Sequence, residues 1–331
     1  MRNSKDDKEV ETGSVVVEKV GGRSSVTSCL SRYPLKFVIP RKVGSSKTDV
    51  VWVYALTYGG GIVSGDHILC KFSVEDACTM VLTTQASTKV YKSEGSKVSQ
   101  QILEARVGSN ALLAIIPDPV TCFSTARYYQ KQILSVSSDS NLVIVDWITS
   151  GRYESGEKWD FDLYRSTNNI FLEDGQPLFL DTDRNLASYV AFDISPPVAY
   201  NTRKKHASSD IIRQRKDGLY SGTHARLPSN CNDYTPRVRP KMQCVQNLVQ
   251  DHVKKLMSEQ LQLSPAALRH QRDKADHSMS KPSFVASCSV FGPKKIGLVV
   301  RVAAMTTESV YMFLRHQLAP LEVMLGVPPY R

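Results

Sequence analysis

The stretch VWVYALTYGGGIVSGDHILCKFSV, residues 51–74, sets the expectation for the fold. The residues before the glycines are apolar on both faces, as in a buried β-strand. After the glycines, apolar side chains recur with a period of two, which is the pattern of a second strand, at Ile68, Cys70, Phe72 and Val74. The glycines at 59–61 and 65 predict a tight turn, because close backbones or a positive φ exclude a Cβ atom there.

Similar short strands are predicted from residue 14 to residue 199, between turn signals that recur roughly every ten to fifteen residues. The pair Asp174-Gly175 indicates a hairpin. The pattern therefore predicts a mainly β fold of many antiparallel strands, arranged as a sandwich, a barrel or a solenoid. No sequence repeat of fixed period selects among these three architectures.

The second half of the chain begins with a segment of different composition. Residues 201–241 hold 10 Lys and Arg against 3 Asp and Glu, a net charge of +7. We interpret residues 201–243 as an atypical basic loop or insert, and residues 1–13 as a disordered tail. The remaining pattern favours a single domain over residues 14–331.

Helices are predicted only in this C-terminal half. Residues 245–260 carry an amphipathic stripe, and residues 264–282 follow as a polar linker. A hairpin is predicted over residues 284–305. A closing helix over residues 307–325 is expected to be capped by Thr306, and Pro320 is expected to kink it or to end its first half.

The net charge of the whole chain is +10, and most of it comes from the basic segment at 201–241. Charge concentrated in one polar segment indicates solubility and weak association, so no nucleic-acid partner is expected. The seven cysteines are an odd number without CxxC spacing, which is typical of reduced thiols. Without an apolar leader or a run of about 18 apolar residues, we expect a cytoplasmic protein with no membrane partner.

Common nucleotide and nucleophile motifs do not fit the glycine run. Gly60 and Gly65 have the spacing of a phosphate-binding loop, but Asp66 and His67 stand where Lys and Ser or Thr are required. The run contains neither GxGxxG nor GxSxG. A turn between two strands therefore explains the glycines best.

Residues 58–93, YGGGIVSGDHILCKFSVEDACTMVLTTQASTKVYKS, resemble the core signature of the urease accessory protein UreD (UreH) family. In that family a triple-glycine turn is followed by a Gly-Asp pair and then by a Leu-Thr-Thr-Gln-x-x-Thr-Lys-x-Tyr segment. The matching residues here are Gly59, Gly60, Gly61, Gly65, Asp66, Thr83, Thr84, Gln85, Thr88, Lys89 and Tyr91. The likeness extends over residues 14–199 and 244–330. Within the family, the sequence resembles the eukaryotic, plant-type branch.

The resemblance implies a scaffolding chaperone of urease maturation that is not an enzyme. Its implied partners are apo-urease, a UreF-like accessory protein and a UreG-like GTPase that carries nickel. Together they insert nickel into the urease active site, so no tightly bound cofactor is implied, only a nickel ion in transit. The implied fold is an extended, helically wound antiparallel β-structure with two α-helices in the C-terminal half.

A nickel path needs ligands that bind loosely, and oxygen donors suit this better than thiolate clusters. The candidate ligands are Asp66, His67, Asp118, Asp146, Glu154, Glu157, Asp160 and Asp162. On a strand, Asp160 and Asp162 would share an inward face. The alternative for each carboxylate is a solvated loop residue, and for Asp66 an acceptor of turn N–H groups. The histidines have no partner at i+2 to i+4, so no local metal site is predicted.

Two other functions stay open on the sequence alone. A β-fold hydrolase could use Asp146 with Glu157 or Asp160 as paired carboxylates. A nucleic-acid binder could use the basic segment at 201–241. Lys89 and Tyr91 could form a ridge that faces a partner or a solvated strand face.

Overall fold

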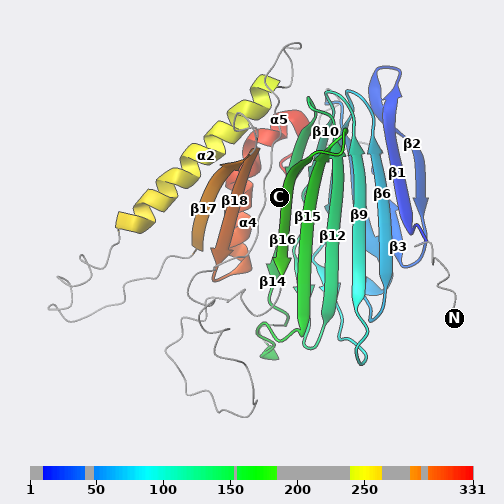
Figure 1. The fold of residues 1–331 in the computed structure, drawn as a ribbon, viewed down its shortest axis with the longest axis vertical. Coiled ribbons are helices and arrows are strands. Elements are labelled where there is room, and N and C mark those ends of the chain that lie inside the picture. Colours follow the sequence, from blue (N-terminus) through cyan, green and yellow to red (C-terminus); the bar gives the residue numbers. More distant parts are fainter. Residues whose placement is uncertain are drawn as a thin grey trace.

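Figure 1 shows the computed structural model, which describes residues 10–41, 48–152, 155–184, 239–262, 284–291 and 297–330. The prediction of a mainly β fold is confirmed. The strands of the N-terminal body are β1 (Gly13–Val20), β2 (Arg23–Ser31), β3 (Leu35–Val38), β4 (Val51–Thr57), β5 (Gly61–Ile62), β6 (His67–Val74), β7 (Thr79–Thr84), β8 (Thr88–Val90), β9 (Ser99–Val107), β10 (Leu112–Ile115), β11 (Val120–Cys122), β12 (Arg127–Val136), β13 (Asn141–Ile144), β14 (Ile148–Thr149), β15 (Leu163–Leu172) and β16 (Pro177–Arg184).

These strands form three sheets that the chain visits in rotation. The seven-stranded sheet has the order β16-β15-β12-β9-β6-β1-β2, the five-stranded sheet β13-β10-β7-β4-β3 and the four-stranded sheet β14-β11-β8-β5. From β6 onward each coil takes one strand from each sheet, so the expected helical winding is confirmed.

The expectation of antiparallel pairing is wrong for the coils. The ladders β6–β9, β9–β12 and β12–β15 are all parallel, as are the ladders of the other two sheets between successive coils. Successive coils run in the same direction, and stacking them pairs each strand with its equivalent one coil later. Antiparallel pairs remain at the edges, where β2 folds back on β1 and β16 on β15.

The coils are similar in length without repeating in sequence. Thr79 lies beside Leu112, and Leu112 beside Asn141, so one coil contains about 30 residues. The loops between strands vary in length from coil to coil. This variation hides the structural repeat from a search at fixed period.

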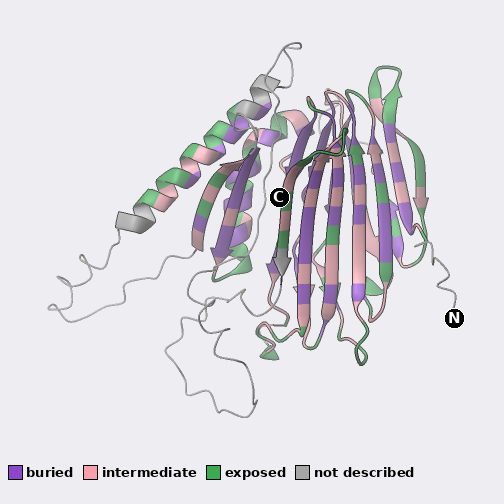
Figure 2. Ribbon diagram, viewed as in Figure 1, coloured by how far each residue is buried: buried purple, intermediate pink, exposed green. Residues whose placement is uncertain are grey.

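The interior of the solenoid is an apolar core enclosed by the three sheets. Alternate residues of the seven-stranded sheet point into it, including Phe72, Leu134 and Ile170, which are buried. Residues Leu112–Ile115 of β10 are all buried, because the five-stranded sheet is covered on both faces. In Figure 2, buried residues, coloured purple, recur along the strands of the solenoid.

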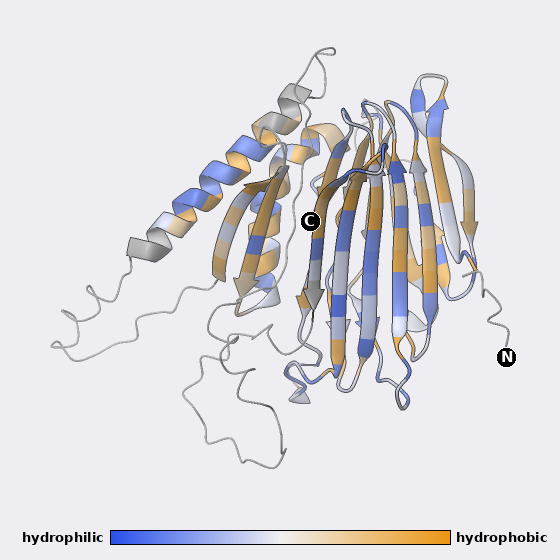
Figure 3. Ribbon diagram, in the orientation of Figure 1, coloured by the Kyte–Doolittle hydropathy of each residue, from blue (hydrophilic) through white to orange (hydrophobic). Residues whose placement is uncertain are grey.

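A C-terminal cap covers the outer face of the five-stranded sheet. We define the cap as residues 239–330; its described elements are α2 (Arg239–Gln262), β17 (Phe284–Phe291), β18 (Gly297–Ala304), α4 (Thr307–Leu318), η4 (Ala319–Leu321) and α5 (Glu322–Leu325). Its buried side chains form one apolar cluster with Trp52, Val81 and Leu112 of the sheet. The hydrophobic and hydrophilic stripes of α2 are visible in Figure 3. This second core joins the cap to the solenoid.

The cap elements follow the sequence pattern closely. β17 and β18 pair antiparallel, as the hairpin prediction requires. Thr306 accepts a hydrogen bond from the Ser309 N–H at 3.2 Å and caps α4 as predicted. Pro320 lies in the 3-10 turn that separates α4 from α5. The helix predicted over residues 245–260 begins earlier, at Arg239, so residues 239–243 are helical and not part of a loop.

Other domain predictions fall on segments without a described structure. Residues 201–238 of the basic segment and the whole linker at 264–282 lie outside the described residues. Residues 1–9 of the expected tail also lie outside them, and β1 begins at Gly13.

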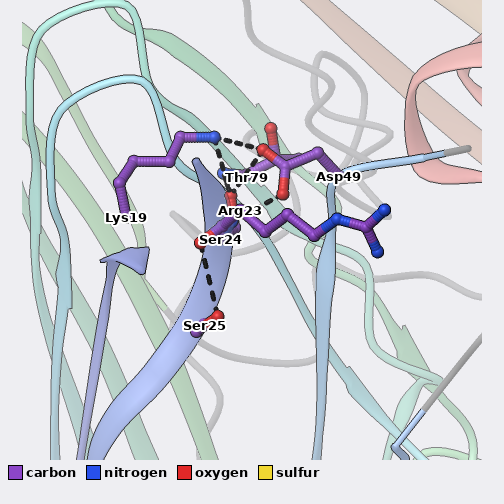
Figure 4. Close-up of polar contacts among 6 residues, drawn as sticks. All are labelled: Lys19, Arg23, Ser24, Ser25, Asp49 and Thr79. Atoms are coloured by element: carbon purple, nitrogen blue, oxygen red, sulfur yellow. Dashed lines mark hydrogen bonds and ion pairs between the residues drawn. The ribbon is translucent and has the colours of Figure 1, made fainter. Parts of the chain in front are cut away.

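A polar cluster holds the tip of the β1–β2 hairpin against the five-stranded sheet (Figure 4). Asp49 accepts hydrogen bonds from the Lys19 ammonium and from the Ser24 backbone N–H, and Ser24 Oγ accepts one from Thr79 N–H at 3.1 Å. Partial burial opposes ionisation of Asp49. The hydrogen bonds from Lys19 and Ser24 outweigh that effect and lower the pKa of its carboxyl.

Candidate functional site

The two halves of the family motif meet at one corner of the solenoid. We call it the glycine corner: the turn Tyr58–Gly60 (η1), strand β5 and the adjacent strand β8. Gly59 has φ 78°, which favours glycine. The Tyr91 hydroxyl donates a hydrogen bond to the Gly59 carbonyl at 3.0 Å. The glycines therefore form the predicted turn between strands.

Close packing explains the third glycine of the motif. A Cβ atom on Gly61 would lie 2.5 Å from the Lys89 carbonyl oxygen and 2.8 Å from the Tyr91 ring. Lys89 and Tyr91 therefore both lie over Gly61, with Lys89 exposed and Tyr91 half-buried. The partner ridge and the solvated strand face both stay predictions for these two residues.

The second motif turn is built around Asp66. Its carboxylate accepts the Val63 N–H at 2.9 Å, and Gly65 has φ 84°. The prediction that Asp66 accepts turn N–H groups is confirmed. His67 follows as the exposed first residue of β6. Gln85 is also exposed, and Thr88 begins β8.

Polar contacts join two neighbouring coils to each other and to the cap. Thr83 and Thr84 make the contacts between coils, and Asp118 makes the contact with the cap. The Thr83 hydroxyl donates to the Ile116 carbonyl at 2.8 Å, and Thr84 Oγ1 accepts the Asp118 N–H at 2.8 Å. The Tyr311 hydroxyl of α4 donates to the Asp118 carboxylate at 2.7 Å. Burial and this carboxylate raise the pKa of Tyr311. Asp118 is therefore engaged at a junction between the solenoid and the cap.

Asp146 is the one candidate carboxylate found inside the solenoid, among those described. It is 4% exposed and lies between β13 and β14. It accepts hydrogen bonds from Gln130 Nε2 at 2.9 Å, Ser166 Oγ at 2.6 Å and Asn168 Nδ2 at 2.8 Å. Three donors satisfy the buried charge that would otherwise be costly.

These donors belong to a larger polar patch on the inner side of the seven-stranded sheet. We call it the interior polar cluster: Gln101, Tyr128, Gln130, Gln132, Asp146, Ser166 and Asn168. The Tyr128 hydroxyl donates to Gln101 Oε1 at 3.1 Å, and burial, followed by nearby Cys122 and Asp146, raises its pKa. Within the described part of the chain, the buried oxygens Gln132 Oε1 and Asn168 Oδ1 have no hydrogen-bond partner. The cluster thus offers oxygen atoms that are not used by the fold.

Sequence reasoning missed this cluster apart from Asp146. Gln130 and Gln132 lie two apart on one strand, with the same parity as the buried Leu134 and Val136. That parity was the available signal, because polar residues in register with core residues face the core. Their polar character alone suggests a solvated face.

The remaining acidic candidates lie in the loop segments before β15. Glu157 forms an ion pair with Arg152, and Asp160 accepts the Ser124 hydroxyl at 2.6 Å. Hydrogen bonding to Arg152 lowers the pKa of Glu157. Asp162 lies 4.0 Å from Arg127.

Asp160 and Asp162 are exposed and precede β15, so the expectation of a shared inward strand face is wrong. Glu154 lies outside the described residues. The hydrolase hypothesis is not supported, because Asp146 is enclosed by three donors whereas Glu157 and Asp160 bond to other partners.

The described residues hold no group of three or more His, Cys, Asp or Glu side chains placed to bind a metal. The buried thiols are poor metal ligands as well. Burial, with a smaller contribution from Glu11, raises the pKa of Cys70 to about 12, and burial raises that of Cys122 further. Both therefore stay protonated near neutral pH. Among the described helices, none combines the length and apolar character needed to cross a lipid bilayer.

The fold and the interior polar cluster define a strand-built scaffold with a helical cap. The sequence pattern of the UreD urease accessory proteins matches residues 11–188, a range that includes all the described strands of the solenoid. The chain belongs to the UreD family of urease accessory proteins.

Individual relatives extend the match over the cap. "Urease accessory protein D" of Arabidopsis thaliana is 54% identical over 324 residues, covering 96% of this chain and 99% of that protein. The protein of the same name from Oryza sativa subsp. japonica is 48% identical over 320 residues, covering 96% of this chain and 94% of that one. "Urease accessory protein UreD" of Anaeromyxobacter sp. (strain Fw109-5) is 28% identical over 320 residues, covering 96% and 88%. The expected family and its plant-type branch are confirmed.

Proposed function

We propose that this chain is a non-catalytic, cytoplasmic scaffold of urease maturation. It binds apo-urease and a UreF-like protein, recruits a UreG-like GTPase through the latter and helps to deliver Ni²⁺ to the urease active site. Family membership supports the accessory role. The observation that carries the nickel step is the interior polar cluster around Asp146.

The chemistry of that cluster suits an ion in transit. Carboxylate, amide and hydroxyl oxygens bind Ni²⁺ more loosely than thiolates or several imidazoles do. Asp146 supplies one negative charge in a water-poor interior, and the unpaired oxygens of Gln132 and Asn168 lie on the adjacent strands β12 and β15. The protonated thiols of Cys70 and Cys122 do not compete for the ion. Asp66, His67, Asp118, Glu157, Asp160 and Asp162 are proposed as weaker, outer positions on the path.

The test replaces Asp146 by asparagine, which keeps the size and one acceptor oxygen but removes the charge. Urease is produced in cells in which this chain is the sole UreD-type protein, and its nickel content is measured by mass spectrometry. We expect Asp146→Asn to lower nickel per urease active site several-fold. The matched control Asp174→Asn lies in an exposed hairpin turn and should leave nickel content unchanged.

Partner binding is measured separately on the same variants. The chain should co-purify with urease and the UreF-like protein and be more soluble with the UreF-like protein than alone. Normal nickel in urease made with the Asp146→Asn variant would refute the interior path. Normal nickel in urease made without this chain would refute the maturation role.

A further inference from the structure

A groove between α2 and α4 brings together two histidines that are far apart in sequence. The groove has a volume of about 390 Å³ and is lined by His252 from α2 and by Glu308, His316 and Gln317 from α4. Apolar side chains, among them Leu256 and Phe284, form the rest of its wall. It lies on the cap and does not involve Asp146 or any other residue of the proposed nickel path.

We propose that His252 and His316 form a binding site for a divalent transition-metal ion of the Ni²⁺ or Cu²⁺ type. Their ring centres are 4.4 Å apart and the rings are inclined at 56°. A metal about 2.1 Å from a ring nitrogen lies about 3.2 Å from the ring centre. Two such rings at a right angle around the metal have centres about 4.5 Å apart, whereas a tetrahedral angle requires about 5.2 Å.

Gln317 orients the first imidazole. Its side chain is 2% exposed, and its amide nitrogen contacts His252 Nδ1. Its Oε1 atom has no partner among the described residues. A half-turn of the amide places this oxygen at Nδ1, where it accepts the ring N–H and leaves the lone pair of His252 Nε2 for a metal. Metal-bound histidines characteristically donate their other N–H in this way.

The remaining ligands and the nearby charge determine how tightly the site binds the ion. No third His, Cys, Asp or Glu of the described residues completes the ligand set, so water fills the other positions. Glu308 at the groove wall adds negative charge that favours a cation. Two imidazoles with water are expected to hold the ion reversibly. The site does not depend on the proposed function, because binding is an equilibrium property of this chain alone.

Calorimetric titration of the purified full chain with NiCl₂, and separately with CuCl₂ and ZnCl₂, tests the site. We expect His252→Ala and His316→Ala each to remove one class of bound Ni²⁺ or weaken it at least tenfold. Gln317→Leu should weaken the same class, whereas Gln317→Glu, which accepts Nδ1–H more strongly, should tighten it. Asp174→Asn, in the exposed turn between β15 and β16, is the control and should change nothing.

A second measurement avoids any dependence on variants that fail to fold. In the wild-type chain, Ni²⁺ should protect His252 and His316 from modification by diethyl pyrocarbonate, as mapped by mass spectrometry, whereas Mg²⁺ at the same concentration should not. Unchanged Ni²⁺ binding in folded histidine variants, or no protection of the two rings, would overturn the proposal. The Asp146→Asn variant should keep this site, which separates its outcome from that of the interior path.

Discussion

Replacing Gly61 by alanine probes the close contact between coils at the glycine corner. Gly61 has φ 175°, an extended conformation open to any residue, so the cost of a side chain there is steric. The new Cβ would lie 2.5 Å from the Lys89 carbonyl oxygen, and ordinary contacts begin at 3.4 Å, so the overlap is about 0.9 Å. β5 pairs with β8 only through Gly61 and Ile62, and it must shift away from β8.

The shift has a definite energetic cost. Overpacking against a fixed backbone atom costs about 2 kcal/mol. Loosening the hydrogen bond from Tyr91 N–H to the Ile62 carbonyl, now 2.9 Å, costs about 1 kcal/mol more. The free energy of unfolding should therefore fall by about 3 kcal/mol, which lowers Tm by roughly 6 to 12 °C.

Urea unfolding of the full chain, followed by tryptophan fluorescence, measures this change. Gly59→Ala is the matched control, because a Cβ there meets nothing within 4 Å and only the positive φ is strained. That variant should lose about 1 kcal/mol. Equal losses for the two variants, or no loss at Gly61, would show that close approach is not the reason for the third glycine.

Three further predictions concern the hydrogen bond of Tyr311, the ionisation of Asp49 and the reactivity of two cysteines. Tyr311→Phe removes the hydrogen bond to Asp118 and should lower the free energy of unfolding by about 1 to 2 kcal/mol, measured by urea titration. The lowered pKa of Asp49 stabilises the fold above its unfolded pKa near 4, so this contribution is lost as pH falls through the lower folded value. Between pH 5 and 3 the wild type should lose more stability than Asp49→Asn. With iodoacetamide at pH 8, exposed Cys244 should react in the folded chain, whereas Cys70, whose pKa is raised to about 12, should react only after unfolding.

Each of these predictions has a result that contradicts it. For Tyr311 it is a loss equal to that of Tyr33→Phe, which alters an exposed side chain. For Asp49 it is an identical pH profile for wild type and variant between pH 5 and 3. For Cys70 it is alkylation at the rate of Cys244 in the native protein.

Local features of the fold were predictable from the sequence. Each strand has a period-two pattern or a turn signal of its own, and Thr306 is recognisable as a cap because its partner is three residues away. Hairpin pairing was predictable, but pairing between successive coils was not, since it joins residues roughly 30 positions apart. The same residue pattern is compatible with antiparallel hairpins and with stacked parallel coils.

The candidate site residues also differ in whether local sequence or long-range packing brings them together. The motif residues around Gly59 and Asp66 form compact turns that the sequence indicates directly. The donors to Asp146 come from β12 and β15, which meet only when two coils are stacked. His252 and His316 likewise become neighbours only through packing of α2 against α4.

The two-sided burial of the five-stranded sheet also affects how the protein is made. On the ribosome, the solenoid strands emerge before the cap, which begins at residue 239. Trp52, Val81 and Leu112 therefore form an exposed apolar surface until the cap has been synthesised. A nascent chain stalled at this stage would be prone to aggregate through that surface. Early engagement by a helper protein, or slow translation of the intervening segment, would then govern how much of the protein survives to reach its mature state.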